Sequence, residues 1–299
     1  MTQTFSSPQV VCRPALAHDQ ADVNEFCKGI WSGHDYVPDV WDHWFKDPHG
    51  ILAVAEYNGH AIGCSKISLI SEGQWWLEGF RVDPNYQGRK VGSRIHEYVT
   101  DWWQEHGDGT VRLMTSAENT AVHHLCVKTG YLKTQEVCGY AAGPIDISTD
   151  NFRPATDAAE TAAFALQSES LKITGQLIDF GWRIGTADEQ VFDKYSGYKA
   201  DFVHTFYWWR NKQGLFSAWE DDENGKRTLF LGVLACALED MPALLVDIRS
   251  FATGKNFDST FQIAFVIPQV ISQLQKAGFM KDWDHNAFVF EKTQPNKKR

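Results

Sequence analysis

A polar loop between an apolar strand and an amphipathic helix is the sequence feature that most restricts how this chain can fold. Residues 75–82 predict a strand, and residues 87–93 predict a glycine-containing loop. Ile95 and Val99 then begin the apolar face of a helix. The first amides of a helix have no internal partners and lie at its positive end. This strand–loop–helix step therefore predicts an anion site made largely of backbone.

The residues of the loop suit such a site. Gly88 and Gly92 allow close approach of the backbone, and Arg89 and Lys90 add positive charge. An ordinary strand-to-helix turn with exposed cations would show the same spacing. The pattern alone leaves both interpretations open.

The elements around this step predict an α/β (α+β) domain with a mixed central sheet. Asn58 and Gly59 separate two apolar runs, which is typical of a β-hairpin. Between residues 10 and 140 we expect a strand, two helices and a meander of three strands. The loop and its helix follow, and then a strand, a helix and a final strand.

The second half of the chain repeats short parts of the first. Residues 152–156 resemble residues 12–16, and residues 274–279 resemble residues 125–131. Both pairs fall at corresponding positions of their halves, which favours a duplicated fold.

The domain boundary is predicted in residues 141–154, which are rich in Gly, Pro, Asp and Ser. We therefore expect one domain over residues 8–142 and a second over residues 150–293. The second half has a hairpin pattern at residues 221–225 but no glycine-rich loop before an amphipathic helix. We expect it to lack a cofactor site of its own.

The composition narrows the class of protein. The chain has 299 residues, 43% of them hydrophobic, and a net charge of −10, which argues against a nucleic-acid partner. Its start shows no signal peptide, and no apolar run approaches the roughly 20 residues that span a bilayer. Six cysteines without a C-x-x-C pair suit reduced thiols. We expect a cytoplasmic protein, monomeric or homodimeric, with no membrane partner and no metal.

Two segments carry a resemblance to a known family. Gln87-Gly-Arg-Lys-Val-Gly92 resembles motif A of the GNAT acetyltransferases, Q/R-x-x-G-x-G/A, which follows a strand. Residues 119–131 resemble the N-x-x-A-x-x-L-Y-x-K-x-G-F segment of the same family. The resemblance covers residues 8–140 and implies a GNAT fold, acetyl-CoA as co-substrate and a second, degenerate GNAT-like half.

The resemblance also implies roles for individual residues. Glu78 is the candidate general base, and Cys126 stands where many members have a tyrosine that acts as general acid. Packing in an apolar core would equally explain Cys126. At the first motif glycine this chain has Lys90, which predicts a backbone conformation there that a side chain tolerates. The expected cofactor-binding residues are Phe80, Arg81, Val82, Gln87, Gly88, Arg89, Lys90, Val91, Gly92, Ser93 and Asn119.

The acceptor-gripping loop of the family corresponds to residues 30–38. This segment is similar to a G-H-D-Y-x-P stretch of histidine N-acetyltransferase-like sequences, which implies that His34, Asp35 and Tyr36 bind a small amine. Asp35 would pair with the ammonium group. Histidine, or another free amino acid, is the leading acceptor. Acetylation of a peptide N-terminus or a lysine, or non-catalytic sensing of acyl-CoA, are the alternatives.

Overall fold

A computed structural model describes residues 9–147, 150–196, 204–223 and 225–295. The predicted start of the first domain, residue 8, lies outside these ranges. The chain forms two compact units, each made of segments that are not continuous in sequence. Unit 1 consists of Met1–Leu113, Ala121–Leu132 and Glu291–Arg299, and unit 2 consists of Met114–Thr120 and Lys133–Phe290. The predicted domains are single continuous ranges, whereas these units are made of several segments. The two divisions cannot be compared directly, and the predicted boundaries stay a prediction.

Unit 1 is built around an antiparallel meander that ends in one parallel strand pair. Its strands lie in the order β1-β2-β3-β4-β5, and only β4 and β5 run parallel. The elements are β1 (Val11–Pro14), α1 (Asp19–Cys27), the 3-10 helix η2 (Trp31–Gly33), α2 (Val37–Lys46), β2 (Ile51–Tyr57), β3 (His60–Ser71), β4 (Gln74–Val82), the 3-10 helix η3 (Pro84–Tyr86), α3 (Val91–His106), β5 (Gly109–Ser116) and α4 (Thr120–Lys128).

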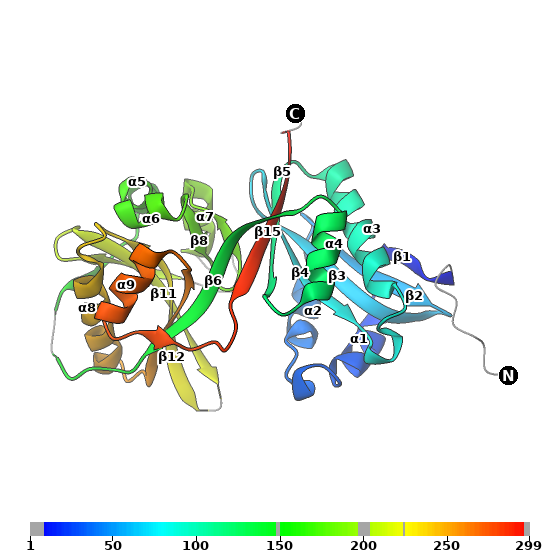
Figure 1. Cartoon of the computed structure of the whole chain (residues 1–299), viewed down its shortest axis with the longest axis horizontal. Helices are drawn as coiled ribbons and strands as arrows, with labels where there is room; N and C mark the ends of the chain where they lie inside the picture. Colours follow the sequence, from blue (N-terminus) through cyan, green and yellow to red (C-terminus); the bar gives the residue numbers. More distant parts are fainter. Residues whose placement is uncertain (1–8, 148–149, 197–203, 224, 296–299) are drawn as a thin grey trace. The chain divides into compact units, whose positions relative to one another are not determined.

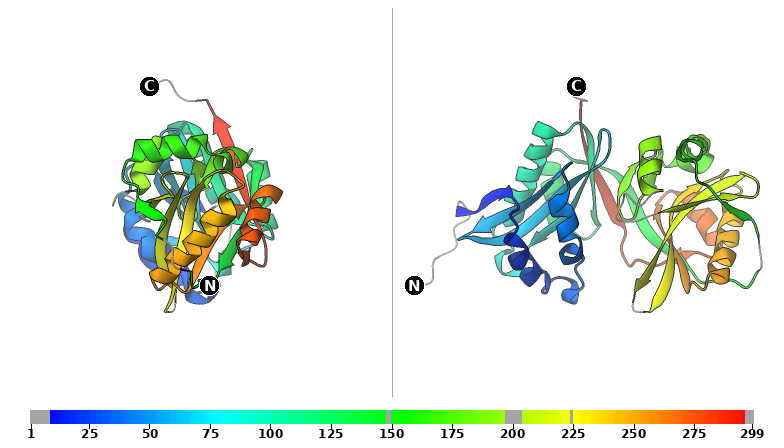
Figure 2. Two further views of the ribbon diagram at one scale, coloured as in Figure 1. Left: turned by 90° about the vertical axis from the view of Figure 1, so that its left-hand side faces the viewer. Right: turned by 180° about the vertical axis from the view of Figure 1, so that it is seen from behind.

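Helices cover both faces of this sheet (Figures 1 and 2). Alternation along β2 separates the two cores, because successive side chains of a strand point to opposite faces. Leu52 and Val54 pack with buried residues of α1 and α2. Ala55 and Tyr57 pack with the first turns of α3. The hairpin predicted at Asn58 is confirmed, since β2 and β3 pair up to Tyr57↔His60.

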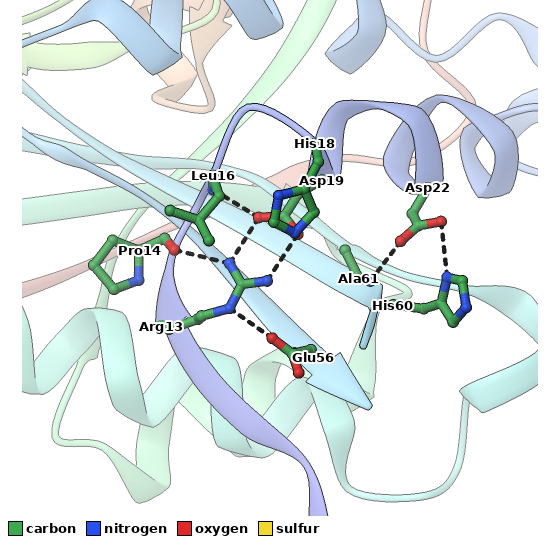
Figure 3. Close-up of polar contacts among 9 residues, drawn as sticks. All are labelled: Arg13, Pro14, Leu16, His18, Asp19, Asp22, Glu56, His60 and Ala61. Carbon is green, nitrogen blue, oxygen red and sulfur yellow. Dashed lines mark hydrogen bonds and ion pairs between the residues drawn. The ribbon is translucent and has the colours of Figure 1, made fainter. Parts of the chain in front are cut away.

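A partly buried ion network holds β1 to α1 and to β2 (Figure 3). Arg13 on β1 donates hydrogen bonds of 2.7 and 2.9 Å to Asp19, at the start of α1, and one of 2.7 Å to Glu56 on β2. Burial would raise the pKa of Asp19, but these bonds and the amide of Leu16 hold it below its usual value. The network ties one helix and two strands together.

Unit 2 repeats the strand topology of unit 1. Its strands follow the order β7-β10-β11-β12-β13, antiparallel except for the parallel pair β12–β13. The elements are β7 (Phe152–Pro154), α5 (Ala158–Gln167), α6 (Glu169–Ile173), β8 (Leu177–Asp179), β9 (Ile184–Thr186), α7 (Glu189–Tyr195), β10 (Thr205–Trp209), β11 (Gly214–Glu223), β12 (Lys226–Ala235), α8 (Met241–Gly254), β13 (Ser259–Phe265), α9 (Pro268–Lys276) and β14 (Met280–Lys281). Two more strands complete the chain, β6 (Leu132–Ala142) and β15 (Ala287–Gln294).

The repeated topology explains the sequence echoes. Each echo of the first kind contributes to the first strand of its unit, β1 or β7, and each echo of the second kind contains a left-handed glycine, Gly130 or Gly278, just before its last residue. The predicted hairpin of the second half is also confirmed, since Glu223 pairs with Lys226. The predicted duplication of the fold therefore holds.

The two units differ in the charge that precedes their equivalent helices. Arg89 and Lys90 come before α3 in unit 1, whereas Glu239 and Asp240 come before α8 in unit 2. Acidic side chains there oppose the binding of an anion at the helix start. The absence of a cofactor site in the second half stays a prediction, and this charge difference supports it.

Candidate active site

A β-bulge interrupts β4 in the middle of the candidate site. On β3, Cys64 pairs with Arg81 and Lys66 pairs with Glu78. Ser65 therefore opposes two residues of β4, Gly79 and Phe80. Gly79 has φ 61°, in the left-handed region that favours glycine.

The bulge changes which side chains of β4 share a face. In a regular strand, residues three apart point to opposite faces. Here Glu78 and Arg81 stand opposite Lys66 and Cys64, which are two apart and share a face. That face is covered by α1 and α2, because Cys64 belongs to their core and Lys66 bonds Asp47 at the end of α2. Glu78 and Arg81 thus lie on one side of the sheet.

Sequence reasoning found Glu78 but missed Gly79. A glycine inside a strand pattern often marks a bulge, so this signal was present at residues 75–82. A Cβ at Gly79 would lie 2.4 Å from Cζ3 of the buried Trp44. Both the left-handed φ and the contact with Trp44 require glycine here.

Glu78 is half-buried and held by its neighbours. Ser68 Oγ donates a 2.9 Å hydrogen bond to its Oε1. Lys66, fully buried, donates a 2.5 Å bond to Asp47. Burial would raise the pKa of Asp47, but the bond from Lys66 outweighs it and keeps this pKa low. Lys66, the cross-strand partner of Glu78, is therefore paired with the carboxylate of Asp47.

The sequence predicted a role for the main chain of Arg81 but none for its side chain. Its Nε donates to Asp35 Oδ2 at 2.6 Å, and its Nη2 donates to Asp35 Oδ1 at 3.1 Å. Asp35 also accepts the amide of Val37, and its side chain is fully buried. Both of its oxygens are thus engaged within the protein, which argues against the predicted contact of Asp35 with an ammonium group.

The two neighbours of Asp35 behave differently. His34 is exposed and ends η2. The ring of Tyr36, also exposed, lies 5.3 Å from the Arg81 guanidinium carbon, and the Trp31 ring lies 4.3 Å from it. Of the three predicted acceptor residues, Asp35 and Tyr36 gather around Arg81.

The predicted anion loop leads directly into α3. The first intrahelical bond runs from the Arg94 amide to the Lys90 carbonyl, so the amides of residues 91–93 precede it. Among the described residues, no side chain caps the start of α3. Three amides at the positive end of a 16-residue helix are therefore available to an anion.

The backbone of the loop corrects one expectation. Lys90 has φ 66°, in the left-handed region, and not the side-chain-tolerant conformation that we predicted. Gly88, with φ 72°, has open space where its Cβ would lie. Helix α3 needs this sharp change of direction to begin directly after the loop, and a lysine adopts it at a cost of about 1 kcal/mol.

Two further loop residues fit the same site. Gln87 and Arg89 are exposed, and the Arg89 guanidinium lies 5.5 Å from the ring of Tyr86. A Cβ at Gly92 would lie 3.2 Å from the ring of Phe80, so this glycine lets α3 approach the bulge of β4. The helix start and the bulge therefore belong to one compact structure.

Lys90→Gly and Lys90→Ala separate charge from backbone strain. Both variants remove the same positive charge, and we expect both to weaken acetyl-CoA binding equally. Only Lys90→Gly relieves the left-handed strain, so it should be more stable than Lys90→Ala by about 1 kcal/mol. Urea unfolding and calorimetry measure the two quantities. Equal stability of the two variants would contradict the strain at φ 66°.

Cys126 and Asn119 both lie in or next to α4, but Cys126 is buried and Asn119 is exposed. Cys126 is fully buried in α4, and burial raises the pKa of its thiol to about 12. This favours packing over the role of general acid, because such a thiol releases its proton reluctantly. Asn119 is exposed at the start of α4, where its amide bonds the Ser116 carbonyl. Its contact with pantetheine stays a prediction.

Behind the bulge, a buried histidine supports Phe80. His96 of α3 lies 6.0 Å from the Phe80 ring, edge to face, and its Nε2 is 2.9 Å from Thr129 Oγ1. Burial lowers the pKa of His96 from 6.5 to about 4, so the ring is neutral at pH 7. Its role is therefore packing and hydrogen bonding, not charge.

His96 predicts a loss of stability in acid. Its folded pKa of about 4 lies below the ordinary 6.5, so the unfolded chain binds more protons between these values. Stability from this group is complete above pH 6.5 and falls as the pH drops toward 4. We expect His96→Gln to reduce the loss between pH 7 and pH 4.5 by about 2–3 kcal/mol in urea unfolding. His60→Gln, at an exposed site, should leave the loss unchanged.

A family model matches the part of the chain that holds this site. Residues 18–131 match the model described as the acetyltransferase (GNAT) family. A human protein named "Probable N-acetyltransferase 16" is 28% identical over 101 residues, 32% of this chain and 27% of that protein. A histidine N-acetyltransferase of Oreochromis niloticus is 25% identical over 88 residues, 29% of this chain and 26% of the relative. The chain thus matches about a quarter of the length of these relatives.

Solved structures show the same fold over nearly the whole chain. A GCN5-related N-acetyltransferase from Sphaerobacter thermophilus superposes with a TM-score of 0.60 at 14% identity, covering 95% of both chains. A tandem GNAT protein from the clavulanic acid biosynthesis pathway gives a TM-score of 0.60 at 10% identity, covering 96% of this chain and 100% of its own. The predicted GNAT fold with a second GNAT-like half is confirmed.

Neither a membrane-spanning helix nor a metal-binding group is found among the described residues. Across residues 9–147, 150–196, 204–223 and 225–295, no helix is long and apolar enough to cross a membrane. The same ranges contain no group of three or more His, Cys, Asp or Glu side chains placed to hold a metal ion.

Proposed function

We propose that this chain moves an acetyl group from acetyl-CoA to the amine of a small acceptor, because residues 18–131 match the acetyltransferase (GNAT) family model. A free amino acid is the proposed acceptor, and histidine is the leading candidate. The single observation that carries the proposal is the bulge of β4 packed against the uncapped start of α3.

The residues present fit a CoA thioester. The amides of residues 91–93, with Arg89 and Lys90 beside them, suit the diphosphate. Pairing of β4 with β5 runs from Gln74↔Thr110 to Trp76↔Arg112, while β4 continues to Val82. The edge of β4 beyond this register leaves main-chain groups of Phe80, Arg81 and Val82 for the pantetheine arm, as in a strand addition.

The chemistry requires few groups. Glu78 accepts a proton from the acceptor ammonium, directly or through a water. The amine nitrogen then forms a bond to the thioester carbonyl carbon, and a main-chain N–H at the bulge stabilises the oxygen that gains negative charge. The carbon–sulfur bond breaks and CoA leaves as a thiolate, and the nitrogen, positively charged after the attack, gives up its second proton to the thiolate or to water. Placement of both reactants on one strand contributes much of the acceleration.

The proposed choice of acceptor has two supports. Two relatives, from Oreochromis niloticus and Xenopus tropicalis, are named histidine N-acetyltransferase, at 25% and 30% identity over short stretches. In this chain, Trp31, Tyr36 and Arg81 form a polar and aromatic cluster on the same face as Glu78. Such a cluster suits a small zwitterion better than a long aliphatic amine.

An acceptor panel tests the proposal. The full chain is given acetyl-CoA and each of the twenty amino acids, a set of peptides with free N-termini, and lysine side-chain substrates, and released CoA is measured. We expect turnover on free amino acids, with histidine first. Turnover on peptides alone would show that the acceptors are peptides and not free amino acids. Binding of acetyl-CoA without turnover on any amine would indicate a sensor and contradict the transferase.

A further inference from the structure

Arg81 has more hydrogen-bond donors than the protein uses. A guanidinium carries five N–H groups. Nε and Nη2 donate to Asp35, and Nη1 donates to the Phe80 carbonyl at 3.1 Å. One N–H of Nη1 and one of Nη2 have no partner among the described residues. With Nε and Nη2 bonded to Asp35, the second N–H of Nη2 lies on the outer edge of the planar group, which it shares with Nη1. A pair of N–H groups on that edge matches the two oxygens of a carboxylate.

We propose that this outer fork of Arg81 binds the carboxylate of the acceptor, so that the enzyme acetylates amino acids as zwitterions and discriminates against their amides and decarboxylated amines. This inference rests on the proposed acetyl transfer. It gives Asp35 the task of orienting Arg81, in place of the contact with the ammonium group that the sequence suggested.

The surroundings of the fork prepare it for a ligand. Asp35, fully buried, holds the guanidinium from one edge through two bonds. The Trp31 and Tyr36 rings lie 4.3 and 5.3 Å from its central carbon, and the two rings are neighbours, stacked with centroids 6.5 Å apart. The Arg81 side chain is only 11% exposed, while Trp31 and Tyr36 are 61% and 40% exposed. An oriented, nearly dehydrated cation with exposed aromatic walls is suited to bind a small anion.

The position of the fork favours the acceptor over the cofactor. The side chain of Arg81 lies on the face that α1 and α2 cover, whereas α3, with its free amides, packs on the opposite face of the sheet. Glu78 shares the face of Arg81. Their partners on β3 are two residues apart, which corresponds to about 7 Å along a strand. Side chains of this length allow one α-amino acid to place its amine at Glu78 and its carboxylate at Arg81.

A matched set of acceptors tests the inference on the unmodified protein. It consists of the amino acid that the panel ranks first, its α-amide and its decarboxylated amine. We expect kcat/KM to fall between about 10-fold and 100-fold when the carboxylate is lost, as for a hydrogen-bonded ion pair. Equal kcat/KM on the acid and the amide would overturn the inference and leave acetyl transfer intact. No turnover of any of the three would instead mean that the proposed function has failed.

The variant Arg81→Lys tests whether Arg81 causes the preference for acceptors that carry a carboxylate. Lysine keeps the charge but not the fork, so the acid-to-amide ratio of kcat/KM should collapse by at least about 10-fold. Arg13→Lys removes a comparable bidentate pair, with Asp19, elsewhere in unit 1 and should leave the ratio unchanged. A preference for the acid that survives Arg81→Lys would assign the carboxylate to another group. If Arg81→Lys does not fold, the acceptor set on the unmodified protein still decides.

Discussion

Glu78→Gln is expected to lower kcat by between about 10²-fold and 10⁴-fold, while acetyl-CoA binds as tightly as before. Glutamine keeps the shape of the side chain and an oxygen that can accept the bond from Ser68 Oγ. It cannot take the proton of the acceptor ammonium. Because no other group of the proposed site replaces this function, the loss should appear in kcat. Release of CoA at saturating substrates measures it, and calorimetry measures acetyl-CoA binding.

Glu56→Gln is the matched control for this variant. Glu56 is also a partly buried strand carboxylate, and it pairs with Arg13 on the neighbouring strand β1. Its loss should weaken that ion pair and leave kcat unchanged. If both variants keep the original kcat, Glu78 is not the base. If both lose activity alike, the effect arises from the fold and not from proton transfer.

Gly79→Ala is expected to destabilise the protein by about 2–5 kcal/mol, and to lower activity in whatever protein remains folded. The alanine Cβ would meet the Trp44 ring at 2.4 Å in a buried core, and φ of 61° is strained for any side chain. Relief of either requires the bulge to move. Since the bulge places Glu78 and Arg81 on one face, kcat should fall with stability.

Gly88→Ala separates strain from steric conflict. Gly88 has a similar φ of 72°, but nothing lies within 4 Å of its added Cβ. It should cost only the left-handed strain, about 1–2 kcal/mol. Urea unfolding of the two variants gives the comparison. A similar loss for both would show that the Trp44 contact relaxes freely and does not hold the bulge.

Patterns local in sequence were enough for much of the fold. The hairpin at Asn58 depends on two adjacent residues, and the apolar face of α3 depends on spacings of three and four, such as that between Ile95 and Val99. The candidate anion loop was predicted in the same way, from its glycines and its cations. The conformation of Lys90 was not, because sequence does not report φ, and the start of α3 imposes the left-handed turn.

The sequence by itself predicted the resemblance to the GNAT acetyltransferases, the duplicated fold, the candidate anion loop and the candidate base Glu78, since each depends on residues close together in the chain. Only the tertiary structure decided what surrounds that base. The bulge at Gly79 depends on register with β3, and the pair of Arg81 with Asp35 joins residues 46 apart. A buried charge takes a partner wherever the fold supplies one, because an unpaired charge away from water is strongly disfavoured. For that reason Asp35, which the sequence pattern predicted to bind the substrate, is paired with Arg81 within the protein.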